Sequence, residues 1–275
     1  MIKLEKEKDF LICVDSDGTV MDTMILKHKN ALGPSFIEVF NITNHKDEIL
    51  NDWINLNCFS SKRGYNRFIT LDLILEKIKG YGYEFEGAKE YHKWVCETNS
   101  LSIGSLDEMI NNTINISCLR LVKKWAERCN EMITTLPEAK PFENARNIIL
   151  KLKEADLIGV STANEAALSK EWKSIGIYDS FKLVASQEYG TKEFVIKESL
   201  KKGYKKNNAI MIGDSFADIK AAQTAGIWVY PIIPGRENES WNLFYENVYP
   251  KLLNGKFTQE YQDKLLYDFE KSLRS

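Results

Sequence analysis

The stretch DFLICVDSDGTVMDT, residues 9–23, carries five apolar residues directly into two aspartates, Asp15 and Asp17, and then into Gly18 and Thr19. A short unbroken apolar run that ends in turn residues is typical of a strand buried on both faces. Gly18 would let the chain turn sharply, and Thr19 would hydrogen-bond to fix that turn. The alternative is a simple strand-terminating turn with two solvated acids, because Asp-Gly is also common turn chemistry.

The same kind of apolar run recurs later in the chain, and helical patterns separate the later runs. The expected strands are residues 10–14, 157–161, 182–186, 209–213 and 228–233. The expected helices between them are residues 163–175, 192–202 and 216–225. Strand–helix alternation of this kind implies right-handed crossovers. It predicts an α/β fold with a doubly wound parallel sheet, a Rossmann-like core.

The chain between the first strand and the second differs from the rest, because it is helical throughout and lacks short isolated apolar runs. We therefore expect a core made of residues 1–22 and 140–275, interrupted by an all-helical domain at residues 23–139. Pro137 and Pro141 suit the return joint, because proline fixes φ and discourages a helix through it. The tail after Pro234 shows two amphipathic patterns and is predicted to pack on the core as a helical extension.

Composition excludes several classes of function. The 275 residues include 37 Lys and Arg against 39 Asp and Glu, so a net charge of −2 gives no general attraction to nucleic acid or anionic membranes. Five separated cysteines without a CxxC pair, and only three histidines, argue against a zinc site and a disulfide framework. No signal peptide or membrane span is evident, so we expect a cytoplasmic protein whose oligomeric state stays open.

Polar residues follow several of the expected strands, where ligands bind in a doubly wound sheet. Asp15 and Asp17 follow the first run, and Asp214 follows the run at residues 209–213. Two like charges about 4 Å apart cost about 4 kcal/mol at an effective dielectric constant of about 20. Such a cluster must protonate or bind a cation, and oxygen ligands alone favour Mg²⁺.

A phosphate would complete the shell of that cation. Lys192 and the hydroxyl of Ser161 would hold the remaining phosphate oxygens, together with backbone N–H groups at helix N-termini. Lys197 is the alternative to Lys192, and Thr162 is the alternative to Ser161. For Asp214 and Asp218 the alternative is helix N-capping.

Four segments together resemble the haloacid dehalogenase superfamily, in its phosphatase branch. They are DSDGT (15–19), VST (160–162), Lys192 within GTKEF, and GDSFAD (213–218). The resemblance implies that Asp15 is the nucleophile that forms an aspartyl-phosphate, and that Asp17 is the general acid and then the general base. It also implies that Asp15, the backbone carbonyl of Asp17 and Asp214 ligate Mg²⁺, with Asp218 supporting the metal shell.

The helical insert resembles the cap domain of this superfamily, which closes over the site and excludes water. Its stretch FSSKRGYNRF (59–68) is either a substrate-specificity loop or a solvated basic helix start. Trp53, Trp94 and Trp125 are expected to be core. The segment IPGRENESW (233–241) is a candidate for the border of the crevice. Candidate substrate-binding residues are Gly18, Thr19, Thr162, Arg63 and Arg67.

The function expected from these patterns is a Mg²⁺-dependent phosphomonoester hydrolase acting on a small phosphorylated metabolite. Two alternatives remain: a phosphomutase on a sugar phosphate, and a catalytically silent protein that binds a phosphate ligand. A dehalogenase is disfavoured because it needs neither an aspartate at position 17 nor a metal. A phosphonate hydrolase is disfavoured because its second acid is typically replaced.

Overall fold

The computed structural model describes residues 2–114, 116–163 and 165–273. The chain divides into two compact units. The core unit comprises Met1–Thr23 and Glu138–Ser275, and the helical unit comprises Met24–Pro137. The two ends of the expected core, residues 1 and 274–275, and residue 164 of the expected helix at 163–175 lie outside the described residues.

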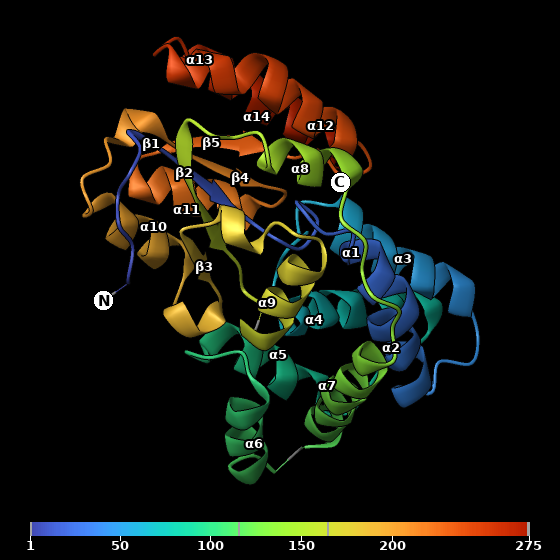
Figure 1. Ribbon diagram of the computed structural model, residues 1–275. Helices are drawn as coiled ribbons and strands as arrows, with labels where there is room; N and C mark the ends of the chain where they lie inside the picture. Colours follow the sequence, from blue (N-terminus) through green and yellow to red (C-terminus); the bar gives the residue numbers. More distant parts are fainter. Residues whose placement is uncertain (1, 115, 164, 274–275) are drawn as a thin grey trace. The chain divides into compact units, whose positions relative to one another are not determined.

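The core unit contains a five-stranded sheet in which every neighbouring pair is parallel, in the order β3-β2-β1-β4-β5 (Figure 1). Its strands are β1 (Phe10–Val14), β2 (Ala155–Val160), β3 (Leu183–Ala185), β4 (Ala209–Gly213) and β5 (Trp228–Pro231). The chain moves outward from β1 to β3 and then returns to the other side of β1 at β4. A crevice for ligands is expected where the strand order reverses, which here is at the carboxyl ends of β1 and β4.

Apolar residues on both faces of the sheet explain why these strands read as unbroken apolar runs. Leu11 and Cys13 of β1 belong to one buried cluster, whereas Ile12 and Val14 belong to another. The first cluster is completed by α10 (Lys192–Leu200) and α11 (Phe216–Ala225). The second is completed by α8 (Glu143–Ile149), α9 (Glu165–Ser174), α12 (Glu237–Leu243) and α13 (Tyr249–Leu253). The predicted doubly wound α/β fold is therefore confirmed.

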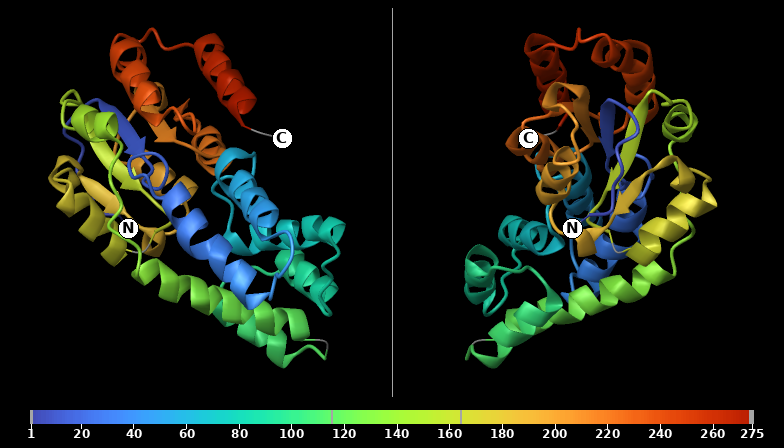
Figure 2. Two further views of the ribbon diagram at one scale, coloured as in Figure 1. Left: turned by 90° about the vertical axis from the view of Figure 1, so that its right-hand side faces the viewer. Right: turned by 60° about the vertical axis from the view of Figure 1, so that its left-hand side comes forward.

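The helices after Pro234 pack on the other elements of the core unit. Helix α14 (Gln259–Ser272) lies beside the edge strand β5, and α12 lies beside α8 (Figures 1 and 2). The buried amide oxygen of Gln262 accepts a hydrogen bond from the backbone N–H of Val229 in β5, at 2.8 Å. The side chain of Gln262 therefore satisfies a backbone N–H of β5 that would otherwise bond to a further strand.

Replacing Gln262 with leucine is expected to lower the free energy of unfolding by about 1–3 kcal/mol, because the N–H of Val229 would stay buried without an acceptor. Urea unfolding of the two proteins measures the difference. Gln259→Leu is the matched control, since Gln259 is exposed at the start of the same helix and bonds only to Asp263. Equal losses in the two variants would contradict the role given to Gln262.

In the helical unit, the regular elements of described residues 24–114 and 116–137 are all helices. The α-helices are α1 (Met24–Lys27), α2 (Gly33–Val39), α3 (Lys46–Phe59), α4 (Arg67–Lys77), α5 (Ala88–Glu97), α6 (Ile103–Asn111) and α7 (Ser117–Thr134). A π-helix, η1 (His28–Leu32), joins α1 to α2, and a 3₁₀-helix, η2 (Ile78–Tyr81), follows α4. Trp53, Trp94 and Trp125 are buried in the core of this unit, as expected. Among the described residues of the whole chain, no helix combines the length and the apolar character needed to cross a membrane.

Candidate active site

The loop that follows β1 turns sharply at the carboxyl end of the sheet. Asp15 continues the pairing with β4, because its N–H donates to the carbonyl of Ile212 at 3.0 Å. The carbonyl oxygen of Ser16 then accepts three N–H groups, from Thr19, Val20 and Met21, at 3.2, 2.9 and 2.9 Å. Gly18 has a φ of +77°, a conformation that favours glycine. The turn leaves the carboxylate of Asp15 buried at the switch point of the sheet.

The loop after β4 is tied to the loop after β1 by a hydrogen bond between two buried side chains. The hydroxyl of Thr19 donates to Oδ1 of Asp214 at 3.2 Å. The backbone N–H of Thr19 helps to fix the turn, as expected, through its bond to Ser16, whereas the side chain makes a second bond that the sequence did not predict. Its side chain is fully buried toward β4, so it bonds across to the neighbouring strand end. Thr19 thus holds Asp214 close to the turn that carries Asp15.

Lys192, at the start of α10, supplies the positive charge of the site. Its Nζ lies 2.7 Å from Oδ1 of Asp15 and 2.6 Å from Oδ1 of Asp218, and its side chain is only 11% exposed. Lys197, the alternative in the sequence, pairs with Glu193 at 2.5 Å and is 47% exposed. The structure therefore brings Lys192, and not Lys197, to Asp15.

Asp218 combines a capping role with the ion pair. It forms a capping box with Ser215 at the start of α11, where its Oδ2 accepts from the Ser215 hydroxyl at 2.6 Å and from the Ser215 N–H at 3.2 Å. Its other oxygen holds Lys192. A Cβ at Gly213 would lie 2.3 Å from a carbon of this carboxylate, so only glycine permits the close approach. The N-capping alternative is correct for Asp218, but it does not exclude a place in the site.

Three buried carboxylates gather around this lysine. Asp15, Asp214 and Asp218 each offer an oxygen atom, and these atoms all lie within 4.8 Å of one another. Burial raises the pKa of Asp15 well above its usual value; Lys192 opposes that rise, and the charges of Asp218 and Asp214 add to it. Burial also disfavours the charge of Lys192, but Asp15 and Asp218 outweigh it and raise the pKa of the lysine.

One lysine cannot balance three carboxylates, so the group favours a further cation. Its donor atoms are all oxygens, which suit a hard ion such as Mg²⁺. The chemistry of the donor set therefore fits the metal that the sequence predicted. Figure 1 labels the two strands concerned, β1 and β4. Asp15 directly follows β1, and Asp214 directly follows β4.

The carboxylate of Asp17 takes a different partner from that of Asp15. Its Oδ1 accepts a hydrogen bond from the hydroxyl of Thr23 at 2.5 Å, and Thr23 is fully buried. Asp17 is half-buried and is not a member of the three-carboxylate group. Sequence reasoning missed Thr23, because nothing in the pattern of residues 17–23 distinguishes this threonine from a turn residue.

Ser161 and Thr162 differ in exposure at the end of β2. Ser161 is buried, and its hydroxyl accepts from the N–H of Ala163 at 3.1 Å, whereas Thr162 is exposed. The backbone N–H of Ser161 also pairs with the carbonyl of Ala185 at 2.9 Å. Ser161 is thus fixed at the carboxyl end of its strand, which favours it over Thr162.

Two indole groups support the loop after β1, and the sequence did not predict either contact. Nε1 of Trp172 donates to the hydroxyl of Ser16 at 3.0 Å, and Nε1 of Trp241 donates to the carbonyl of Thr19 at 2.8 Å. Trp241 ends the segment 233–241, for which a place at the border of the crevice was expected. Its indole contacts the loop that carries Asp15 and Asp17.

The basic residues of segment 59–68 find partners within the helical unit. Arg63 is buried and its guanidinium donates to the carbonyl of Cys58 at 2.7 Å, so a solvated helix start is wrong for this residue. The guanidinium of Arg67 donates to Asn130 at 2.9 Å and lies over the ring of Trp125. Burial lowers the pKa of Arg67. Both arginines therefore stabilise their own unit.

Residues 72–232 match the family model described as haloacid dehalogenase-like hydrolase. This stretch includes Ser161, Lys192, Asp214 and Asp218, whereas Asp15 and Asp17 precede it. No curated protein matches the chain.

A search of solved structures finds similar chains of low sequence identity. A haloacid dehalogenase-like family hydrolase from Streptococcus pneumoniae is 16% identical with a TM-score of 0.53, over 90% of this chain and 97% of that chain. A haloacid dehalogenase-superfamily hydrolase from Geobacter sulfurreducens is 13% identical, with a TM-score of 0.47 over 81% of this chain and 86% of that chain. A hydrolase of the same family from Deinococcus radiodurans, with bound phosphate and sodium, is 12% identical, with a TM-score of 0.45 over 83% of both chains.

Proposed function

The chain belongs to the haloacid dehalogenase-like hydrolases, and we propose that it is a Mg²⁺-dependent phosphatase of small phosphorylated metabolites. The observation that carries this proposal is the buried group of Asp15, Asp214 and Asp218 around Lys192, at the carboxyl ends of β1 and β4. A carboxylate, a lysine and a hard-cation site so close together suit the transfer of a phosphoryl group to the carboxylate.

In the first step a carboxylate oxygen of Asp15 attacks phosphorus, and the bond between phosphorus and the ester oxygen breaks. Asp17 gives its proton to that oxygen, so that the product leaves as a neutral alcohol. The hydroxyl of Thr23, at 2.5 Å, fixes the orientation of the Asp17 side chain. The product of this step is an aspartyl-phosphate on Asp15.

In the second step water attacks the phosphorus of the aspartyl-phosphate, and Asp17 takes a proton from that water. The bond between phosphorus and Asp15 breaks, which releases inorganic phosphate and restores both carboxylates. Lys192 and the hydroxyl of Ser161 hold phosphate oxygens in both steps. Asp218 keeps the ammonium group of Lys192 in place, because one of its oxygens bonds to Nζ while Ser215 fixes the other.

Asp15, the backbone carbonyl of Asp17 and Asp214 would hold the Mg²⁺ ion. When bound, the ion supplies positive charge that offsets the carboxylates and the phosphate oxygens. Thr19 contributes to this site through Asp214, whose carboxylate it orients. We further propose that the helical unit serves as the cap that excludes water during the reaction.

A panel of phosphate monoesters, assayed for released phosphate with Mg²⁺, tests the proposal. We expect at least one small ester to be hydrolysed, and removal of the metal with a chelator to lower turnover by at least about 10³, because the carboxylates then repel the substrate. Added Mg²⁺ should restore the rate. Turnover that withstands the chelator would contradict the metal site.

The same panel separates the alternatives. A phosphomutase would isomerise a sugar phosphate in the presence of a bisphosphate and release little inorganic phosphate. A protein that only binds phosphate ligands would turn over none of the esters. Either result would overturn the assignment as a phosphatase.

A further inference from the structure

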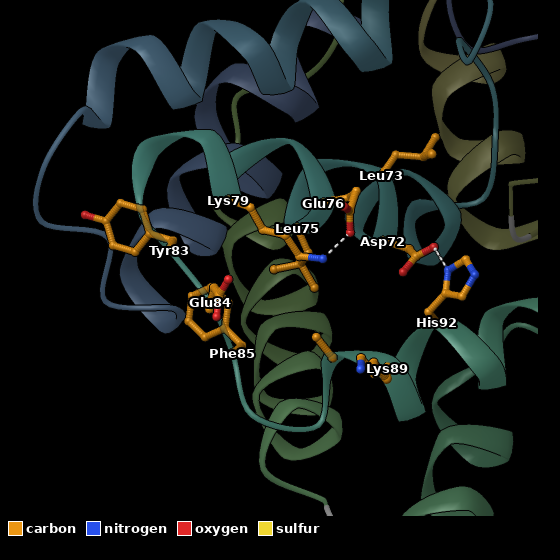
Figure 3. Close-up of a pocket in the computed structure, with 11 residues that line it drawn as sticks. Asp72, Leu73, Leu75, Glu76, Lys79, Tyr83, Glu84, Phe85, Lys89 and His92 are labelled. Atoms are coloured by element: carbon orange, nitrogen blue, oxygen red, sulfur yellow. Dashed lines mark hydrogen bonds and ion pairs between the residues drawn. The ribbon is translucent and has the colours of Figure 1, made fainter.

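A cysteine, a histidine and an aspartate form a connected chain of contacts in the helical unit. Nδ1 of His92 lies 2.8 Å from Oδ2 of Asp72, and Nε2 of the same ring lies 3.6 Å from Sγ of Cys96. His92 and Cys96 are one turn apart on α5, whereas Asp72 comes from α4. Figure 3 shows the ring of His92 turned toward the carboxylate of Asp72.

The order of these contacts assigns a role to each group. A carboxylate can only accept from the ring, so Asp72 holds the proton of His92 on Nδ1 and leaves the lone pair of Nε2 facing Cys96. A base that is hydrogen-bonded to a nucleophile and oriented by a third group is the arrangement that activates nucleophiles in general. Cys96 is exposed, so a reagent in solution can reach its sulfur.

The geometry does not suit a metal ion. Asp72 contacts Nδ1 of His92, whereas Cys96 lies near Nε2. Only His92 and Cys96 could therefore bind the same metal ion. Among the described residues, Asp15, Asp214 and Asp218 form the one group of three or more His, Cys, Asp or Glu side chains close enough to hold an ion. A structural zinc site requires four protein ligands.

A cavity of about 400 Å³ adjoins this chain of contacts and is lined in part by Asp72 and His92 (Figure 3). Its volume lies in the range of small-molecule sites. Its wall offers apolar contact through Leu75 and Phe85, and it carries charges of both signs, from Lys79 and Lys89 and from Glu76, Glu84 and Asp72. A small molecule with an apolar body therefore fits beside His92, one helical turn from the sulfur of Cys96.

We propose that Cys96 is a modification site, at which its thiol exchanges with low-molecular-weight disulfides, with His92 as the base and Asp72 as a positioning residue. The thiol proton passes from Sγ to Nε2 of His92, and the thiolate attacks one sulfur of the disulfide. The disulfide bond breaks as a mixed disulfide forms on Cys96. The departing thiolate takes the proton from His92 and leaves as a thiol. Cys96 is oxidised, and half of the small disulfide is reduced.

The 275-residue chain can be tested with the aromatic disulfide 5,5′-dithiobis(2-nitrobenzoate) at neutral pH, where the departing group stays a coloured thiolate whose release is the signal, and the proton held by His92 passes to water. The other cysteines, Cys13, Cys58, Cys118 and Cys129, are buried, so one fast thiol is expected in the folded protein. Cys96→Ser should remove the fast phase. His92→Gln should slow it about tenfold, because no base then takes the proton from the sulfur during the attack.

Asp72 acts through His92, so a carboxylate at this position should matter for the rate of thiol exchange and not only for the stability of the protein. Asp72→Asn should slow the reaction about threefold, since the amide does not favour the required form of the ring, whereas Asp72→Glu should restore most of the rate. His45→Gln is the matched control. His45 is an exposed histidine of the same unit that pairs with Glu48 at 3.5 Å. Its replacement should leave the rate unchanged.

Mass spectrometry after treatment with glutathione disulfide provides a second measurement. One added glutathione on the peptide that contains Cys96 is the expected result. The proposal would be overturned if the folded protein reacted no faster than the urea-unfolded chain, or if His92→Gln and His45→Gln gave the same rate. A cooperative thermal unfolding transition for each variant is the control that the rates are compared between folded proteins.

Discussion

Replacing Asp15 with asparagine is expected to lower turnover by at least about 10⁴, because the amide cannot form the acyl-phosphate and the enzyme retains only binding and electrostatic effects. The substitution preserves the shape of the side chain and the backbone bond to Ile212. The measurement is phosphate release under saturating ester and Mg²⁺. Rapid-mixing kinetics with the wild-type protein should show a burst in which one phosphoryl group is transferred to each active site.

Asp22→Asn is the matched control for this prediction. Asp22 is exposed, lies in the same loop and is not among the three carboxylates that approach one another. Its turnover should equal that of the wild type. If Asp15→Asn kept more than a small fraction of the activity while Asp22→Asn behaved as expected, the nucleophile would have to be another residue.

Lys192→Met is expected to cost both activity and stability. Without the lysine, the buried carboxylates of Asp15 and Asp218 lose their common partner, and breaking such a buried pair typically costs about 3 kcal/mol or more of unfolding free energy. Turnover should fall by about 10³, because the phosphate oxygens lose a fixed positive charge. Urea unfolding in the presence of a chelator and phosphate release with Mg²⁺ measure the two effects.

Lys197→Met controls for the loss of a lysine from the same helix. Lys197 is half-exposed and pairs only with Glu193, so this variant should be nearly as stable and as active as the wild type. Mg²⁺ should also recover part of the stability lost in Lys192→Met, because it neutralises the same carboxylates. Equal behaviour of the two variants would show that Lys192 does not serve the site.

Local patterns in the sequence were sufficient to predict the fold class. The runs at residues 10–14 and 209–213 coincide with β1 and β4, and an aspartate directly follows each strand, Asp15 after β1 and Asp214 after β4. The approach of Asp15 to Asp214 then followed from a general property of parallel sheets, namely that carboxyl ends meet at one edge. The strand at residues 182–186 was shorter than expected, because β3 pairs only along Leu183–Ala185.

The parts of the site that could not be predicted depend on contacts between distant residues. The indole of Trp241 reaches the carbonyl of Thr19 across 222 positions, and that of Trp172 reaches Ser16 across 156. Neither pairing leaves a periodic signal in the sequence. The bond from the Thr19 hydroxyl to Asp214 was missed for the same reason, since the local turn was visible in the sequence and the facing strand end was not. Arg63 looked like a solvated charge because its acceptor is a backbone carbonyl.

The two outer strands of the sheet are protected in different ways. Strand β3 has only three residues and therefore offers little backbone to a foreign strand. Strand β5 is protected by α14, whose Gln262 occupies one of its outward N–H groups. Proteolytic trimming of this last helix would turn β5 into a template to which a strand of a second molecule could add. Helix α14 thus covers part of the outer edge of β5, and a chain that lacks α14 should aggregate even where Asp15, Lys192 and Asp214 are intact.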